Sequence, residues 1–460
     1  MRRIFLLLTF GLTNLALGQE MLSYDNYLTW VRGFHPVAKQ ADITVEFGEM
    51  ELRASRGGFD PRLYGDYEAK RFKNANYFDK REAGLVIPTM AGVELKGMVE
   101  YNSGTLLNPE LEVPEDGLAA LGASVNLAQG LLIDKRRAAL RQAQVYVEST
   151  KAERVQILND LFMESTEAYW SWAADYQNVK ILEGGVKLAE ERFEMVKESY
   201  LQGDFPAIDT VEAYTQVMDR IYRLQSAQIQ YFKATQFLNT FLWDENNEPV
   251  ELLESVYPEN VLDQLLFDYN KETMREYIFR HPQLLMTDYD IESLQIDRRY
   301  KSNMLLPVLK VNYNFLVEKL NDFELSPFLE NNYKIGATFS MPLFLRGERG
   351  NLGLTKAKIN FKTYERDLKL LKLTTKLESE IYNFETVEQQ LGIYTNNVNG
   401  LQKLLRGEMM RFEIGESSLF LVNAREVSLI SAQTTLNDLA AKRKSAYAKM
   451  LNAAGLGFDE

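Results

Sequence analysis

The sequence contains no cysteine and only two histidines in 460 residues. The lack of cysteine excludes disulfide bonds, thiolate metal sites and the lipidated cysteine of a bacterial lipoprotein. A zinc enzyme is not expected either, because both histidines precede a proline and no thiolate is present. Nucleophile-elbow, phosphate-loop and dinucleotide-binding motifs are also missing. We therefore expect no enzyme activity, no metal and no cofactor.

Basic residues are outnumbered in this chain. The 52 lysines and arginines stand against 65 acids, so the net charge is −13. Nucleic acids and anionic lipid surfaces bind a basic face, and neither is an expected partner. With so many acids, a close pair of carboxylates is no evidence for acid–base catalysis. Beyond residue 18, no apolar run approaches the roughly 20 residues of a membrane-spanning helix.

Residues 1–18 have the pattern of a secretory signal peptide. Arg2 and Arg3 form the basic start, residues 4–17 form the apolar core, and Gly18 ends a small-residue cleavage site. A membrane anchor is the alternative, although an apolar core of about 14 residues is short for a bilayer span. We expect an exported, unlipidated protein that is cleaved near Gly18.

Proline is absent from two long stretches, residues 134–200 and 350–412. In both, apolar residues recur at alternating steps of three and four, the spacing that places them on one stripe of a helix. Each stretch predicts a helix of roughly 90 to 100 Å at the rise of an α-helix. Rods of this length pack on other rods.

The two halves of the chain repeat each other. His35-Pro36 and His281-Pro282 each open a helical pattern. A second proline follows 25 residues later in both halves, Pro61 after Pro36 and Pro307 after Pro282. The offset between the halves is 246 residues here and falls to 214 at residues 122–127 and 336–341, so the first half has about 32 extra residues. A metal-binding histidine pair is the alternative, but proline at the first position of a helix favours helix starts.

This repeat predicts the domain organisation. It comprises a signal peptide (1–18), a first repeat (19–242), a connecting subdomain (243–272) and a second repeat (273–460). The first repeat has a strand region at about 61–130, a long helix at 131–200 and a return helix at 207–241. The second has strands at about 307–345, a long helix at 350–412 and a return helix at 419–454. Gly203 and Gly415 mark the turns between the helices.

The strand regions alternate apolar and polar residues and carry aromatic residues near their ends. Strands are expected at residues 62–73, 82–88, 92–101 and 117–129 of the first half and at 307–317 and 333–344 of the second. This pattern is typical of a membrane β-barrel strand, with an ordinary exposed sheet as the alternative. The two halves supply about four to six spanning strands, whereas single-chain barrels begin at eight. Open strand edges are not tolerated in lipid, so such a barrel must close between chains.

The order of these elements resembles the TolC family of outer-membrane efflux channels. The resemblance covers the two His-Pro openings, the strand-to-helix junctions and the turns at residues 203–209 and 415–425. Two features differ from the family. Ala128 stands where the family often has a proline and where the second repeat has Pro342, and the extra residues of the first repeat are either strands or an external loop.

The resemblance implies a mixed α and β fold. Duplicated long helical hairpins would form the α-barrel tunnel of a homotrimer, and the strands would share one transmembrane β-barrel. It also implies outer-membrane lipid, a periplasmic adaptor and an inner-membrane pump of unknown class as partners, in a Gram-negative bacterium with the helices in the periplasm.

The two helical turns are the candidate functional site. Four acids lie where three chains would converge, which would make rings of like charge that constrict a pore: Asp204, Asp209, Glu413 and Glu416. The alternative is that they are solvated carboxylates at helix ends. Small and apolar residues that suit the docking of a partner's helical hairpin are Gly203, Phe205, Pro206, Ile414, Gly415, Ser417, Ser418, Leu419 and Phe420.

These features together predict a passive exit duct for small molecules or proteins. Its helical tips would open when the adaptor docks. A periplasmic coiled-coil scaffold or adaptor without a pore is the alternative, which accounts for the long helices and leaves the aromatic-rich strands unexplained.

Overall fold

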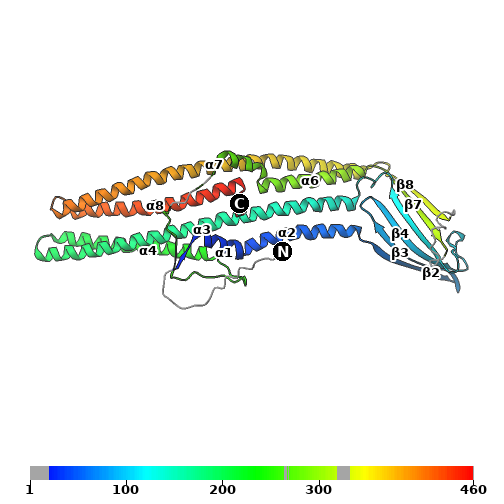
Figure 1. Cartoon of the computed structure of the whole chain (residues 1–460), viewed down its shortest axis with the longest axis horizontal. Coiled ribbons are helices and arrows are strands. Elements are labelled where there is room, and N and C mark those ends of the chain that lie inside the picture. The colour runs from blue at the N-terminus through cyan, green and yellow to red at the C-terminus, as the bar shows by residue number, and fades with distance from the viewer. Residues whose placement is uncertain (1–19, 264–266, 268, 319–331, 459–460) are drawn as a thin grey trace, which may run out of the picture. The chain divides into compact units, whose positions relative to one another are not determined.

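Two α-helices of 68 residues are the longest elements of the described chain (Figure 1): α3 (Lys135–Gln202) and α7 (Arg346–Glu413). Each is about 100 Å long at the rise of an α-helix. Neither contains a proline, so nothing interrupts the hydrogen bonds of the helical backbone.

The computed structural model describes residues 20–263, 267, 269–318 and 332–458. The expected signal peptide lies outside them. Two compact units are present. The helical unit takes the described residues of 1–41, 155–278 and 372–460, and the sheet unit takes residues 42–154 and the described residues of 279–371. Both halves of the chain therefore contribute to both units.

The helical unit contains two antiparallel helical hairpins, α3 with α4 (Ala207–Asn239) and α7 with α8 (Leu419–Ala454). Its core is built around Trp170, Trp172 and Tyr169 of α3, all at most 1% exposed. The smaller elements of this unit are α1 (Tyr24–Phe34), the start of α2 (Pro36–Arg56), α5 (Lys271–Tyr277), the 3₁₀ turn Ile278–Arg280 at its boundary, and two short strands, β1 (Glu20–Leu22) and β6 (Val256–Pro258).

The connecting region is held in this core by hydrogen bonds. Strand β6 pairs in parallel with β1. The Tyr169 hydroxyl donates to the Leu22 carbonyl at 2.6 Å and accepts from the Glu259 amide at 3.2 Å. A core aromatic residue of α3 therefore fixes both the N-terminal strand and the segment that joins the two repeats.

The sheet unit contains one six-stranded sheet in the order β2-β3-β4-β5-β7-β8, and every pair is antiparallel. The strands are β2 (Arg62–Phe72), β3 (Ala75–Pro88), β4 (Val93–Ser103), β5 (Leu118–Asn126), β7 (Val308–Val317) and β8 (Tyr333–Ser340). Two 3₁₀ turns, Gly57–Phe59 and Pro109–Leu111, accompany them.

The turn between β2 and β3 consists of Lys73 and Asn74, both with positive φ, at +50° and +59°. This backbone suits the twist of a tight two-residue hairpin. Strand β3 therefore begins at Ala75, well before its apolar end at Pro88.

Two pairs of helices accompany the sheet within the same unit. Segments of α2 and α3 are joined by the ion pair of Arg154 with Asp42 at 2.8 Å. Helix α6 (Pro282–Asn303) is joined to α7 by the pair of Lys362 with Asp290 at 3.1 Å and by the pair of Arg366 with Asp288. Each repeat therefore contributes one such helix pair.

The extra residues of the first repeat form strands. In the part of the chain that the structure describes, the first repeat contributes four strands to the sheet and the second contributes two. Among the described residues, no helix combines the length and the apolar character needed to cross a membrane.

Candidate functional site

One face of the sheet is mainly apolar, and the charged residues of β3 on it, Arg81 and Asp79, form an ion pair with each other at 2.9 Å. The strand register brings together on it Leu63, Tyr67 and Ala69 of β2; Ala83, Leu85 and Ile87 of β3; Val93, Leu95, Val99 and Tyr101 of β4; Ala119, Leu121, Ala123 and Val125 of β5; Leu309, Val311, Tyr313, Phe315 and Val317 of β7; and Tyr333, Ile335, Ala337 and Phe339 of β8. Leu63 is 83% exposed and Phe339 is 69% exposed. An uncovered apolar face of this extent needs an apolar partner.

Aromatic residues cluster on this face where β7 pairs with β8. Tyr313 stacks on Tyr333 with the ring centroids 5.6 Å apart, and Phe315 packs edge-on against Tyr313 at 4.8 Å. Aromatic girdles of this kind border the apolar band of membrane barrels.

The opposite face of the sheet is polar. Glu82 of β3 accepts from Tyr64 of β2 at 2.5 Å and pairs with Lys96 of β4 at 3.1 Å. Two more ion pairs, of Lys80 with Glu68 and of Lys310 with Glu94, lie on the same face, at 3.1 and 3.8 Å. Its charged side chains include both signs, which suits a water-filled lining without strong charge selection.

In the helical unit, both hairpin turns are built alike. Gly203 and Gly415 have φ of +86° and +78°, in the left-handed region that favours glycine. The amides of Gly203 and Asp204 donate to the carbonyls of Tyr200 and Ser199, each at 3.0 Å. The amides of Gly415 and Glu416 make the equivalent bonds to Phe412 and Arg411. Both long helices therefore end in the same glycine cap.

The two hairpin turns contact each other. Phe205 of the first turn stacks on Phe412 at the end of α7, with the ring centroids 6.2 Å apart. Leu419, at the start of α8, is only 5% exposed because it packs with Val196 of α3 and Ala213 of α4. The expectation that Leu419 is an exposed docking residue is therefore wrong, and Phe205 is half-buried.

Other apolar candidates at the turns remain open to a partner. Ile414 is 69% exposed and Phe420 is 64% exposed, and Pro206 is also exposed. The two serines have local partners: the Ser418 hydroxyl accepts from the Leu421 amide, and the Ser417 hydroxyl donates to Glu408 at 2.5 Å.

The four candidate acids lie at these turns. Asp204, Glu413 and Glu416 are exposed, and Asp209 is half-buried near the start of α4. Sequence reasoning missed a fifth acid, Glu408. The hydrogen bond from Ser417, assisted by nearby arginines, holds the pKa of Glu408 below its ordinary value.

The helical unit also contains a buried ionic cluster that the sequence analysis missed. Glu426 of α8 accepts from Arg192 of α3 at 2.8 Å and from Arg220 of α4 at 2.5 Å. Arg220 donates in addition to the Gly185 carbonyl at 2.9 Å. The cluster therefore ties the α3–α4 hairpin to α8. A charged residue on an apolar helix stripe is the sequence signal that points to such a cluster.

The two histidines lie directly before helices, each within its own unit. His35 precedes α2, and its Nδ1 accepts from the Val37 amide at 3.2 Å. His281 precedes α6, and its Nδ1 accepts from the Gln283 amide, also at 3.2 Å. The Pro36 and Pro282 that follow begin these helices. In the described part of the chain, no group of three histidines, cysteines or acids is arranged to hold a metal.

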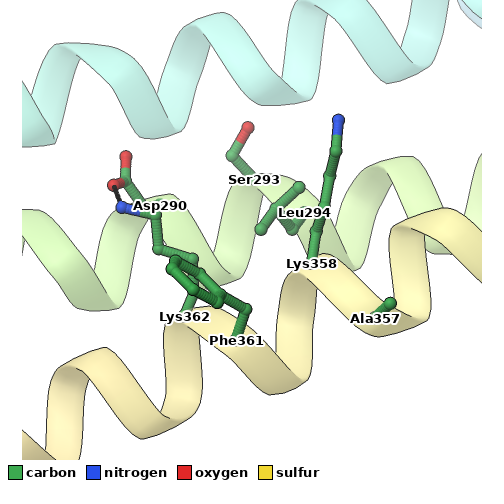
Figure 2. A pocket seen from close by; sticks show the side chains of 7 residues that line it. All are labelled: Asp290, Ser293, Leu294, Ala357, Lys358, Phe361 and Lys362. Carbon is green, nitrogen blue, oxygen red and sulfur yellow. Dashed lines mark ion pairs between the residues drawn. The ribbon is translucent and has the colours of Figure 1, made fainter.

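An open groove of about 570 Å³ lies between α6 and α7 in the sheet unit. Figure 2 shows the ion pair of Asp290 with Lys362, beside Phe361, Ser293 and Leu294. Phe361 is 69% exposed, and it belongs to a run of exposed apolar residues along α7 that includes Tyr364 and Leu368. This surface is a helix face with no cover in a single chain.

No protein-family model matches the sequence, and no curated protein sequence matches it. Solved structures do match. The CmeC outer membrane channel of Campylobacter jejuni is 13% identical with a TM-score of 0.67, over 95% of this chain and 86% of that one. The outer membrane protein VceC of Vibrio cholerae is 14% identical with a TM-score of 0.67, over 95% and 96%. The MtrE outer membrane channel of Neisseria gonorrhoeae is 13% identical with a TM-score of 0.65, over 94% and 88%.

These matches extend over nearly the whole chain and confirm the expected fold. The structures matched are outer-membrane channels of the TolC family. The chain therefore has the channel fold, with long helical hairpins and an antiparallel sheet.

Proposed function

We propose that this chain is one subunit of an outer-membrane channel, the exit duct of a tripartite efflux or secretion system. The observation that carries the proposal is the sheet with one exposed apolar face and one polar face. A sheet that is apolar outside and polar inside is the wall of a membrane barrel. The shared fold with solved outer-membrane channels supports the same function.

The sheet supports self-association. Its outer strands, β2 and β8, each have one neighbour within the chain. In lipid, their unpaired amides and carbonyls would cost several kcal/mol each, so the edges have to pair with other chains. A homotrimer is the assembly implied by the TolC family.

The helices support self-association independently. On α7, Tyr382, Ile393 and Leu404 are each more than half exposed and recur at every eleventh position. This spacing is close to three helical turns, so the side chains form one straight stripe. Helix α4 exposes another set of apolar side chains, Val211, Met218, Tyr222 and Ile229. Neighbouring subunits that pack along such surfaces would enclose a helical tunnel.

In this proposal the hairpin turns are the periplasmic entrance. The exposed Ile414 and Phe420 offer the apolar contacts for a periplasmic adaptor, which would link the channel to an inner-membrane pump. Three copies would bring the exposed acids Asp204, Glu413 and Glu416 around one axis, in rings of like charge that attract cations and constrict the entrance. The buried cluster of Glu426 would resist separation of the hairpins until the adaptor binds.

Transport through such a duct is passive, and the pump supplies the energy. The polar face carries both signs of charge, which is compatible with small molecules or proteins as cargo. We propose no catalytic role for any residue.

The test is fractionation followed by conductance measurement. We expect the full chain in the outer-membrane fraction, a trimer in detergent, and ion conductance in planar bilayers that increases when the tip acids are neutralised. A soluble, monomeric species without detergent would overturn the proposal in favour of a periplasmic scaffold. A membrane-bound trimer without conductance, even with the tip acids neutralised, would contradict the channel.

A further inference from the structure

We propose that an inserted β-hairpin, β3–β4, widens the membrane barrel of this protein to six strands from each chain and 18 in the trimer. The inference rests on the proposed function for the trimer and for the membrane location. It goes beyond that function, because it assigns the wall of the barrel and the surface by which copies of the chain pair.

The internal repeat identifies the insertion. Strands β2 and β7 begin at Arg62 and Val308, at the same offset as the two His-Pro openings. Strands β5 and β8 end at Asn126 and Ser340, at the smaller offset found later in the repeat. Strand β2 therefore corresponds to β7, and β5 corresponds to β8. The difference between the two offsets matches β3, β4 and their turns, which have no counterpart among the described residues of the second repeat.

The insertion lies inside the sheet. In the second repeat, β7 pairs directly with β8. In the first repeat, the equivalent strands β2 and β5 are separated by β3 and β4, which pair continuously with each other and with their outer neighbours. Both inserted strands continue the two-faced pattern, with Leu85 and Val99 on the apolar face and Glu82 and Lys96 on the polar face. The charged residues that β3 places on the apolar face, Arg81 and Asp79, neutralise each other in an ion pair at 2.9 Å. The hairpin is therefore part of the wall and not an external loop.

The two edges of the sheet are complementary. Five successive antiparallel pairs make β8 run opposite to β2, so β8 of one copy pairs antiparallel with β2 of the next. The apolar residues Leu63 and Tyr67 of β2 lie on the same face as Ile335 and Phe339 of β8, so the apolar surface continues across the junction. Every residue of β8 and all but one of β2 are exposed within a single chain. We therefore assign a second copy of this chain as the occupant of each edge.

The size of the barrel follows from its strand number. Barrel diameter grows roughly linearly with the number of strands, and barrels of 16–18 strands enclose an aqueous channel. Without the inserted hairpin, three copies would supply 12 strands. The hairpin would therefore make the barrel about 1.5-fold wider.

Cross-linking tests the edge pairing, and the lack of native cysteine gives a clean background. Full-length chains would carry Ala337→Cys on β8 together with one cysteine on β2. Same-face positions are Leu63, Gly65, Tyr67 and Ala69, and opposite-face controls are Tyr64 and Asp66. We expect oxidation to link one or two same-face pairs between chains and to give a ladder that ends at three chains. No link at any same-face position, equal links at the controls, or a ladder that ends at two chains would overturn the proposal.

Thiol labelling tests whether β4 lies in the wall. In vesicles, Met98→Cys on the polar face should react with a membrane-impermeant maleimide, and Val99→Cys on the apolar face should not. Asn312→Cys and Val311→Cys on β7 form the matched pair outside the insertion. If both β4 positions are labelled while only Asn312→Cys is labelled on β7, β4 is not part of the barrel wall. That result would overturn the proposed insertion and leave the channel function intact. Loss of alternation on both strands would contradict the channel itself.

Discussion

Glu426 of α8 accepts a hydrogen bond at 2.5 Å from Arg220 of α4, with side chains only 5% and 3% exposed. Arg192 of α3 donates to the same carboxylate oxygen at 2.8 Å. One acid therefore pairs with two guanidinium groups of the neighbouring hairpin, of which Arg220 is buried and Arg192 is half-buried. Removing the partner of a buried charge lowers the stability of the fold far more than removing the partner of an exposed charge.

Replacing Glu426 by glutamine should destabilise the helical unit strongly. Glu426→Gln keeps the shape of the side chain and removes the carboxylate that pairs with the buried Arg220 and the half-buried Arg192, at a cost of about 3–5 kcal/mol. Thermal unfolding in detergent, followed by circular dichroism, measures the effect. Glu416→Gln, at an exposed acid of the hairpin turn, is the control and should change little. An unchanged melting temperature for Glu426→Gln would show that the cluster is not a structural tie.

The same cluster predicts an acid-sensitive contribution to stability. Burial alone would raise the pKa of Glu426, but the hydrogen bonds and charges of Arg192 and Arg220 outweigh it and hold the pKa below 4.5. The unfolded chain binds the proton more readily, so this contribution is complete above pH 4.5 and is lost as the pH falls through the folded-state pKa. Melting temperatures from pH 7 to pH 3 should therefore fall less steeply for Glu426→Gln than for the natural chain. Parallel pH profiles would contradict this assignment.

The turn at Gly415 requires a left-handed backbone, with φ of +78°. A Cβ at this position would have no neighbouring atom within 4 Å, so the cost of a side chain is conformational and not steric. Gly415→Ala should lower stability by about 1 kcal/mol. Gly415→Asn should cost less, because asparagine tolerates this conformation better. A melting temperature that is lower for asparagine than for alanine would contradict the conformational argument.

The long helices and the repeat could be predicted from the sequence because they rest on periodic patterns within a continuous segment. The alternation predicts a strand from residue 82, whereas β3 begins at Ala75. The earlier residues were missed because Tyr77 and Phe78 are adjacent and break the alternation, and because the turn at Lys73 and Asn74 has no glycine to mark it. Leu419 follows two serines in the sequence, and only the phase of α8 turns it into the core. Glu426 and Arg220 are 206 residues apart, so no local pattern brings them together.

The junction between the two repeats in the sheet depends on a close approach at Gly122. A Cβ there would lie 2.6 Å from the Tyr313 carbonyl oxygen of β7 and closer still to the Asn314 side chain. Gly122→Ala should therefore disrupt the pairing of β5 with β7, at a cost of about 1–3 kcal/mol. Gly336 is its repeat equivalent on the edge strand β8, where the nearest atom is 3.9 Å away. The heat-dependent shift in gel migration that marks a folded barrel should be impaired for Gly122→Ala and retained for Gly336→Ala. If both variants keep the shift, the close contact at Gly122 is not required for the pairing of β5 with β7.

Lys444 of α8 is a basic residue buried in the aromatic core of the helical unit. Its Nζ lies 3.6 Å from the centre of the Trp170 ring, and the residue is 4% exposed. Burial lowers the pKa of Lys444 to about 8, although Glu259 and Asp263 favour the charged form and Arg443 opposes it.

The unfolded chain keeps an ordinary lysine pKa of 10.5, so it binds the proton more readily than the folded chain. The destabilisation is therefore complete below pH 8 and disappears as the pH rises to 10.5. Lys444→Met should raise stability at pH 7 by about 1–3 kcal/mol, after the loss of the cation–π contact is included. Its advantage should shrink between pH 8 and pH 10.5, whereas Lys442→Met, at an exposed position of the same helix, should show neither effect. A variant less stable than the natural chain at pH 7 would mean that the contact with Trp170 outweighs the desolvation of the ammonium group.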